Sequence, residues 1–183
     1  MRILAIDASI RSTGYTVLEY MEVGETAHVE ALKVERIVTK KTSDENVSLT
    51  IAKIVKELIE IAKEYQVDEV QLEDGYVGKN GKTALLLSGL RQSIVTAFYL
   101  NGIAINTDQP SAIRSTVMGK GSADKREVAE HVQTVFAESK QVKSLGDFCD
   151  KGKKKNDDMY DSILIGLSRV IKGMKTNMSI CYH

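Results

Sequence analysis

The order in which strand-like and helix-like segments follow one another constrains this fold more than any other feature. Two short runs rich in β-branched and apolar residues, 2–8 and 15–20, are separated by a mostly polar turn, which is typical of a β-hairpin. A third strand is expected within 27–38, where apolar and polar residues alternate less regularly. The chain therefore opens with antiparallel strands.

Helices and strands alternate after this opening. Apolar residues recur at helical spacing over 44–65, a buried strand is predicted at 67–72, and a long helix follows at 82–100. The remaining expected elements are a strand at 103–106, a short helix at 111–117, a helix capped by Ser122 that runs through Phe136, and a final helix over 158–171. This order predicts an α/β fold with a mixed sheet of five strands flanked by helices.

The length of 183 residues suits one domain with a full core and leaves no room for two ordinary domains around a cleft. We expect residues 1–173 to form this domain and residues 174–183 to form a flexible C-terminal tail. No apolar run approaches the roughly 20 residues that would cross a bilayer, so no membrane association is expected.

Two cysteines, Cys149 and Cys181, are present, and neither belongs to a spacing typical of a zinc site. Free thiols in a reducing compartment are the simplest interpretation. The N-terminal residues also lack the long apolar region of a signal peptide. The expected location is the cytoplasm.

Charge is segregated along the chain although the formal net charge is zero. Residues 19–74 hold 14 acidic and 7 basic side chains, whereas residues 75–126 hold 7 basic and only 2 acidic ones. A run of basic residues is more often only a solvated surface. It indicates a nucleic-acid partner only if it flanks a catalytic site, because phosphate contacts supply most non-specific affinity for DNA.

Four carboxylates stand at positions where this fold would bring them together. Asp7 and Glu73 end two predicted strands, and Asp158 and Asp161 share one face of the last helix through their i, i+3 spacing. Hard Mg²⁺ or Mn²⁺ ions take such oxygen ligands, and a pair of ions can hydrolyse a phosphodiester. Each acid alone has a simpler structural interpretation, such as a turn cap or a strand-end charge, so only the combination is specific.

The segments around these acids resemble the RuvC family of Holliday-junction resolvases, which have a ribonuclease H-like fold. The similar segments lie in order from residue 3 to about residue 170, and they read IDASIRSTGY at 6–15, EDGYVGKN at 73–80, ALLLSG at 84–89, VMGKGSADK at 117–125 and DMYDSILIGL at 158–167. The chain departs from the family at Ala8-Ser9, which replaces Pro-Gly, at the additional Asp157, and in a longer basic loop at 151–155. Its compact form resembles bacteriophage-encoded members.

The resemblance implies a metal-dependent endonuclease that cuts four-way junctions, with forks as further candidate substrates, through symmetric nicks by a homodimer. It implies two Mg²⁺ ions for each active site, replaceable by Mn²⁺, with the ligands Asp7, Glu73, Asp158 and Asp161. Lys125 would act at the scissile phosphate, and the further DNA-binding candidates are Tyr76, Lys79, Lys82, Arg114 and Lys120. The helix at 82–100 is the candidate dimer interface, with Leu85, Leu86 and Ile94 expected to be exposed; a helix wholly within the core is an equally open interpretation.

Two other functions fit parts of the sequence. The segments AID at 5–7 and TGY at 13–15 also resemble the first phosphate loop of actin and sugar kinases, but such proteins need two related domains, and no second phosphate loop or Gly-Gly adenosine segment is present. A non-catalytic module that binds branched DNA is the other alternative. Such a module is free to lose a carboxylate, whereas all four are present.

Overall fold

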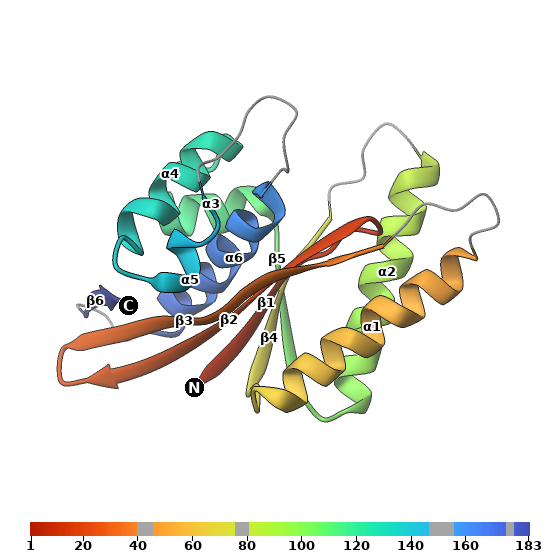
Figure 1. Cartoon of the computed structure of the whole chain (residues 1–183), viewed down its shortest axis with the longest axis horizontal. Coiled ribbons are helices and arrows are strands. Elements are labelled where there is room, and N and C mark those ends of the chain that lie inside the picture. The colour runs from red at the N-terminus through yellow and green to blue at the C-terminus, as the bar shows by residue number, and fades with distance from the viewer. Residues whose placement is uncertain (40–45, 76–80, 147–155, 175–177) are drawn as a thin grey trace.

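A six-stranded mixed sheet forms the centre of the computed structural model, which describes residues 1–39, 46–75, 81–146, 156–174 and 178–183 (Figure 1). The strand order is β5-β4-β1-β2-β3-β6. The strands are β1 (Arg2–Asp7), β2 (Ser12–Val23), β3 (Thr26–Val38), β4 (Glu69–Glu73), β5 (Ala104–Asp108) and β6 (Ser179–Tyr182). The first three pair antiparallel, β4 and β5 continue parallel to β1, and β6 pairs parallel to β3. The predicted mixed α/β sheet is confirmed.

Strand β1 shows that both faces of the sheet are covered. Ile3 and Ala5 are buried in one hydrophobic core, and Leu4 and Ile6 are buried in a second core on the opposite face. All four side chains are inaccessible to solvent. Since successive side chains of a strand point to opposite faces, this continuous apolar run requires helices on both sides.

The helices form two layers around the sheet (Figure 1). One face is covered by α1 (Val47–Glu64) and α2 (Gly81–Leu100), and the other by α3 (Pro110–Met118), α4 (Lys125–Val135), α5 (Lys140–Lys143) and α6 (Asp157–Gly173). Among the described residues, no helix is both long and apolar enough to span a membrane.

Only part of the apolar surface of helix α2 is exposed to solvent. Ile94 is fully buried with Leu90 and Phe98 at i, i+4 spacing in the core beneath α1, so its predicted exposure is wrong. Leu85, by contrast, is 73% exposed, and Tyr99 also faces solvent. The predicted apolar stripe therefore contains one row of core residues and a separate row of exposed ones.

Helix α4 begins at a capping box. The Asp124 carboxylate accepts hydrogen bonds from the backbone N–H groups of Arg126 and Glu127, and the Glu127 carboxylate accepts one from the Asp124 N–H at 2.7 Å. The predicted cap, Ser122, is thus wrong by two residues, because only Asp124 has an acidic partner three positions later. This cap places Lys125 at the first position of the helix.

Helix α6 lies unusually close to the sheet because two glycines leave room for it. A Cβ atom at Gly14 would lie 2.0 Å from the carbonyl oxygen of Asp158, and one at Gly166 would lie 2.7 Å from Leu18 Cδ1. A hydrogen bond of 2.7 Å also joins the hydroxyls of Thr16 and Ser162. The helix is consequently buried on nearly all sides and not along one apolar stripe alone.

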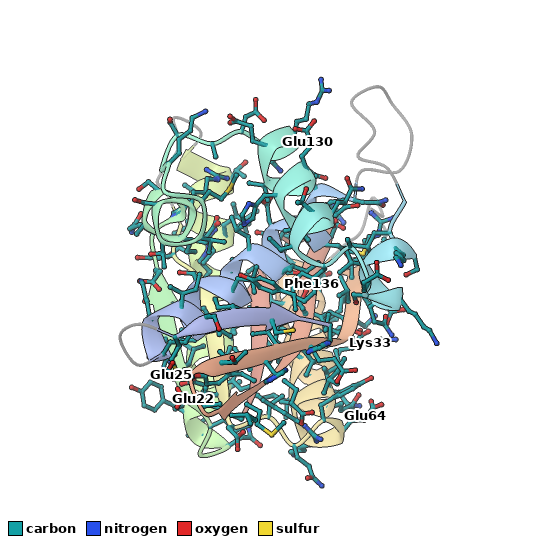
Figure 2. All side chains as sticks on the ribbon, turned by 90° about the vertical axis from the view of Figure 1, so that its left-hand side faces the viewer. Glu22, Glu25, Lys33, Glu64, Glu130 and Phe136 are labelled. Carbon is teal, nitrogen blue, oxygen red and sulfur yellow. The ribbon has the colours of Figure 1, made fainter. Side chains whose placement is uncertain are left out.

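The C-terminal residues contain a strand, β6, where a flexible tail is predicted. Ile180 and Tyr182 pack against the core, and the Tyr182 ring meets that of Phe136 edge-on at 5.2 Å. Phe136, the C-cap residue of α4, is labelled in Figure 2. The tail prediction is therefore wrong for residues 179–182, and the sheet has six strands in place of five. Four residues are too few to show strand periodicity, so only the pairing with β3 reveals this element.

Candidate active site

The ends of β1 and β4 bring two of the predicted acids to one edge of the sheet. These strands are parallel, and Ile6 pairs with Leu72. The next residues, Asp7 and Glu73, are the last of their strands and therefore lie side by side. Their juxtaposition follows from strand direction, since parallel strands that are in register end at the same edge.

The first two turns of α6 supply the other two acids, Asp158 and Asp161, which are 9% and 7% exposed. The Ser12 hydroxyl of β2 donates a hydrogen bond to Asp158, and the Arg36 guanidinium of β3 lies 4.0 Å from the same carboxylate. Arg36 is the partner of Gly14 across the β2–β3 pair. The close approach of α6 at Gly14 thus brings Asp158 within reach of both strands.

The acids influence one another strongly. Burial raises the pKa of Asp7 to about 8, and the neighbouring charges of Asp161, Glu73 and Asp158 add to this effect. Burial also raises the pKa values of Glu73 and Asp161. All four predicted carboxylates therefore face a common, poorly solvated volume, where their mutual repulsion favours a bound cation.

Lys125 places an ammonium group beside two acids of α6. Its ammonium group lies 2.5 Å from Asp157 and 3.5 Å from Asp161. Burial lowers the pKa of Lys125, but the hydrogen bond to Asp157 and the charges of Asp161 and Asp7 outweigh it and raise the pKa. The lysine consequently stays charged at the edge of the acidic cluster.

The other predicted DNA-binding residues have different outcomes. Arg114 on α3 lies close enough to the acids for its charge to lower the pKa values of Glu73 and Asp161, which opposes the effect of burial. Lys120 is exposed just before α4 and pairs with Glu127 at 2.5 Å. The remaining candidates, Tyr76, Lys79 and the side chain of Lys82, lie outside the described residues.

Three residues that contact the site were not identified from the sequence. Ser12 and Arg36 hold Asp158, and Arg91 of α2 lowers the pKa of Glu73. The Arg91 guanidinium also packs on the backbone of Gly75, where a Cβ atom would lie only 1.8 Å from it. Ser12 belongs to the polar turn after Asp7 and could have been considered, whereas no local pattern marks either arginine.

The oxygen atoms of the four acids are spread more widely than the ligands of a single ion. Across the described ranges, the one group of three or more His, Cys, Asp or Glu side chains whose ligand atoms all lie within 4.8 Å of one another is His28, Cys181 and His183. The acids repel one another, and the ammonium of Lys125 partly balances their charge. Their oxygen donors and excess of negative charge nevertheless suit hard divalent cations.

Comparison with known proteins identifies the family. A sequence profile described as crossover junction endodeoxyribonuclease RuvC matches residues 3–150. The chain belongs to the RuvC family. It is 27% identical over 171 residues to the RuvC of Caldicellulosiruptor saccharolyticus, covering 93% of each chain, and 31% identical over 150 residues to that of Clostridioides difficile, covering 82% of this chain and 85% of the relative.

Solved structures of this family share the fold. The Thermus thermophilus RuvC structure matches with a TM-score of 0.74 at 17% identity, covering 98% of this chain and 99% of that one. The T. thermophilus RuvC in complex with a Holliday junction substrate matches with a TM-score of 0.73 at 18% identity over 94% of each chain. The predicted ribonuclease H-like fold and the resemblance to RuvC resolvases are confirmed, and this RuvC-family protein is a metal-dependent endonuclease.

The roles of all the candidate site residues remain predictions, as do the two Mg²⁺ ions and the homodimer. The matched part of the RuvC profile ends before α6, so the roles of Asp158 and Asp161 rest on the geometry described above. The origin of the protein in a bacteriophage likewise remains a prediction.

Proposed function

We propose that this RuvC-family protein resolves four-way DNA junctions by paired, symmetric phosphodiester hydrolysis. The observation that supports it most directly is the convergence of Asp7, Glu73 and the two acids of α6, seen in the raised pKa of Asp7. In a family of crossover junction endonucleases, this acidic cluster beside a charged lysine is the expected hydrolytic centre.

The same four carboxylates are the proposed ligands of two Mg²⁺ ions, with Mn²⁺ as a substitute. The set contains only oxygen donors from three separate elements, which is the chemistry that Mg²⁺ and Mn²⁺ prefer. Three of the carboxyl groups keep raised pKa values despite the nearby cations, so the cluster has a surplus of negative charge for the ions to balance. When bound, such an ion pair supplies an activated water and stabilises the leaving oxygen.

The side chains of Lys125 and Arg114 are proposed to bind the phosphate at the cut. Lys125 is half-exposed and stays charged beside Asp161, so its ammonium can contact a phosphate oxygen while its stem remains fixed at the start of α4. Arg114 approaches the acids from α3, and its guanidinium can bind a phosphate through two hydrogen bonds. Phosphate contacts of this kind position the DNA without reading its sequence.

We place the enzyme in the cytoplasm, where the DNA of a bacterial cell or of an infecting phage is recombined. Tyr76, Lys79, Lys82 and Lys120 remain the proposed contacts to the junction arms and centre, on the strength of the family resemblance and the basic character of residues 75–126.

Cutting two strands at equivalent points of a junction requires two active sites related by the two-fold symmetry of the DNA. We propose a C₂ homodimer in which the exposed row of α2 lies at the interface. Leu85 near the start of this helix and Tyr99 and Leu100 at its end are 73%, 70% and 82% exposed, and an interface along α2 would cover all three side chains. In analytical ultracentrifugation the unchanged protein should be a dimer and Leu85→Glu a folded monomer. An unchanged protein that stays monomeric both with and without junction DNA would contradict the proposed dimer.

Cleavage of labelled DNA tests the function directly. A four-way junction, a Y-shaped fork and a linear duplex of the same sequence are incubated with the protein, with and without Mg²⁺. We expect paired nicks in the junction that depend on Mg²⁺ or Mn²⁺, and far less cutting of the duplex. Tight junction binding without cleavage under every metal condition would instead identify a non-catalytic DNA-binding module.

The variant Asp7→Asn assigns cleavage to the acidic cluster. It should bind the junction almost normally and lose cleavage, because binding rests on phosphate contacts and hydrolysis rests on the metal ligands. The matched control, Glu60→Gln, removes a carboxylate that is 64% exposed on α1 and should cut normally. Substantial cleavage by Asp7→Asn would refute the assignment of the site.

A further inference from the structure

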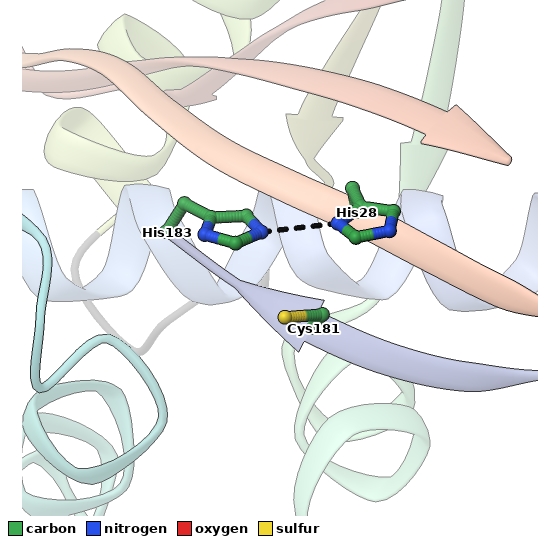
Figure 3. Close-up of side chains that lie close together, drawn as sticks. All are labelled: His28, Cys181 and His183. Carbon is green, nitrogen blue, oxygen red and sulfur yellow. Dashed lines mark hydrogen bonds between the residues drawn. The ribbon is translucent and has the colours of Figure 1, made fainter. Parts of the chain in front are cut away.

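The pairing of β6 with β3 assembles a group of side chains with a different chemistry from the acidic cluster. His28 on β3 and Cys181 on β6 are directly paired across the parallel strands, and His183 follows two residues later (Figure 3). The backbone N–H of His183 donates to the Val29 carbonyl at 2.8 Å, which extends the strand pairing to that residue.

The alternation of both strands points these three side chains to the same face. Ala27 and Val29, on either side of His28, are fully buried in the core beneath α4 and α6. Ile180 and Tyr182 also pack against this core. Because neighbouring residues of a strand face opposite sides, His28, Cys181 and His183 lie together on the outer face of the sheet edge.

The distances between their ligand atoms approach those of a tetrahedral metal site. Nδ1 of His28 lies 3.1 Å from Nε2 of His183, and the two rings are stacked with centroids 5.4 Å apart. Metal–nitrogen bonds of about 2.0–2.1 Å place two such nitrogens about 3.3 Å apart, and a sulfur at about 2.3 Å from the metal lies about 3.6 Å from each nitrogen. All three ligand atoms already lie within 4.8 Å of one another, so a small rotation of the Cys181 side chain completes the set.

We propose that His28, Cys181 and His183 form a transition-metal site, best suited to Zn²⁺, that fastens β6 to β3. Two imidazoles and a thiolate favour Zn²⁺ and related ions over Mg²⁺ and Mn²⁺, which prefer the oxygen ligands of the acidic cluster. Three protein ligands leave a fourth position for water or for the carboxylate of Glu30, which lines the same surface pocket as His183.

A metal ion at this site would stabilise β6, because this strand makes few contacts of its own with the rest of the domain. It contains four residues and pairs with β3 alone, at the edge of the sheet. Its two core-facing side chains, Ile180 and Tyr182, are only partly buried. A metal ion bound by His28 on β3, by Cys181 on β6 and by His183 just after β6 would link the two strands and so stabilise their pairing.

Cobalt substitution tests the site through the thiolate. The untagged 183-residue chain is stripped of metal and titrated with Co²⁺ and, separately, with Zn²⁺ in the presence of a competing chromogenic chelator. We expect one tightly bound ion for each chain, a thiolate-to-cobalt charge-transfer band, and a higher melting temperature with Zn²⁺. Mg²⁺, which is expected to bind at the acidic cluster, should neither produce the charge-transfer band nor displace the tightly bound Zn²⁺.

Variants locate the ion. Cys181→Ser should remove the charge-transfer band, and His28→Gln should weaken Zn²⁺ binding by at least about tenfold, since even residues that only orient metal ligands contribute that much. The matched controls are Cys149→Ser and His131→Gln, which alter the other cysteine and the remaining histidine and should bind normally. Absence of a tight ion, or binding that Cys181→Ser and His28→Gln leave unchanged, would overturn the proposal.

Discussion

The charge on Asp7 should destabilise the protein when no metal is bound, and this cost provides a quantitative test of the site. Burial and three neighbouring carboxylates raise the pKa of Asp7 from 3.8 to about 8. Between these pH values the folded protein holds a proton that the unfolded chain has lost, so stability falls as the pH rises through this range. Asp7→Asn, which carries no charge, should therefore stabilise the metal-free protein at neutral pH.

The size of the effect follows from the pKa difference. At pH 7 the pH lies about 3 units above the pKa of the unfolded carboxyl, whereas the folded carboxyl is still mostly protonated. At about 1.4 kcal/mol for each unit, the free-energy cost to the folded state is at most about 4 kcal/mol. The cost is smaller where the chain rearranges or admits water, and the asparagine amide also loses hydration on burial. We expect a gain of about 1 to 3 kcal/mol, or roughly 3 to 10 °C in melting temperature for a chain of this length.

Thermal and urea unfolding of the two metal-free proteins measure this difference. It should shrink to about 1 kcal/mol or less near pH 4.5, which lies less than one pH unit above the pKa of 3.8 of the unfolded carboxyl. Saturating Mg²⁺ should reverse the order, because ligand at 100 times its dissociation constant stabilises the wild type by about 2.7 kcal/mol and the variant, which lacks one ligand, by much less.

The control variant Glu60→Gln, on the exposed surface of α1, should show no such dependence on pH or metal. An Asp7→Asn protein that is no more stable than the wild type at pH 7 without metal, or a difference that does not change with pH, would refute the reasoning. The acids would then not share one poorly solvated volume.

Three further perturbations test other parts of the site. Gly14→Ala places a Cβ atom 2.0 Å from the backbone of Asp158, so unfolding measurements should show a loss of about 1 to 3 kcal/mol together with loss of cleavage, whereas Gly173→Ala at the opposite end of α6 should be neutral. Lys125→Met should slow single-turnover cleavage by about 100-fold while junction binding stays near normal in gel shifts. Tyr76→Ala should slow cleavage of a fully paired junction by about 5- to 150-fold, the value of one stacked base, and that of a junction already unpaired at its centre much less; equal slowing of both would exclude a role in opening the junction.

The sequence by itself determined the secondary-structure order and the identity of the acids. Asp7 and Glu73 were predictable because each stands at the end of a segment predicted to be a strand, and parallel strands in register bring their ends together. Asp158 and Asp161 were predictable because a spacing of three residues on a helix places side chains on one face. Both inferences use local periodicity, which the sequence records directly.

The tertiary structure decided what depends on contacts between distant segments. Ser12 and Arg36 reach Asp158 only because Gly14 lets α6 approach the sheet, and neither residue stands out from its neighbours in the sequence. Ile94 was predicted to be exposed but is buried, because the sequence of a largely apolar helix does not indicate which of its faces packs on the core.

The C-terminal strand shows the same limit. Cys181 matched no metal-binding spacing, since its candidate partner His28 is 153 residues away and becomes a neighbour only through the parallel pairing of β6 with β3. A short edge strand has too few residues for a periodic pattern, and its position depends on the edge that the rest of the sheet leaves open. Local periodicity thus predicted most of the elements and the proposed catalytic acids, whereas close approach and strand pairing determined which other side chains meet them.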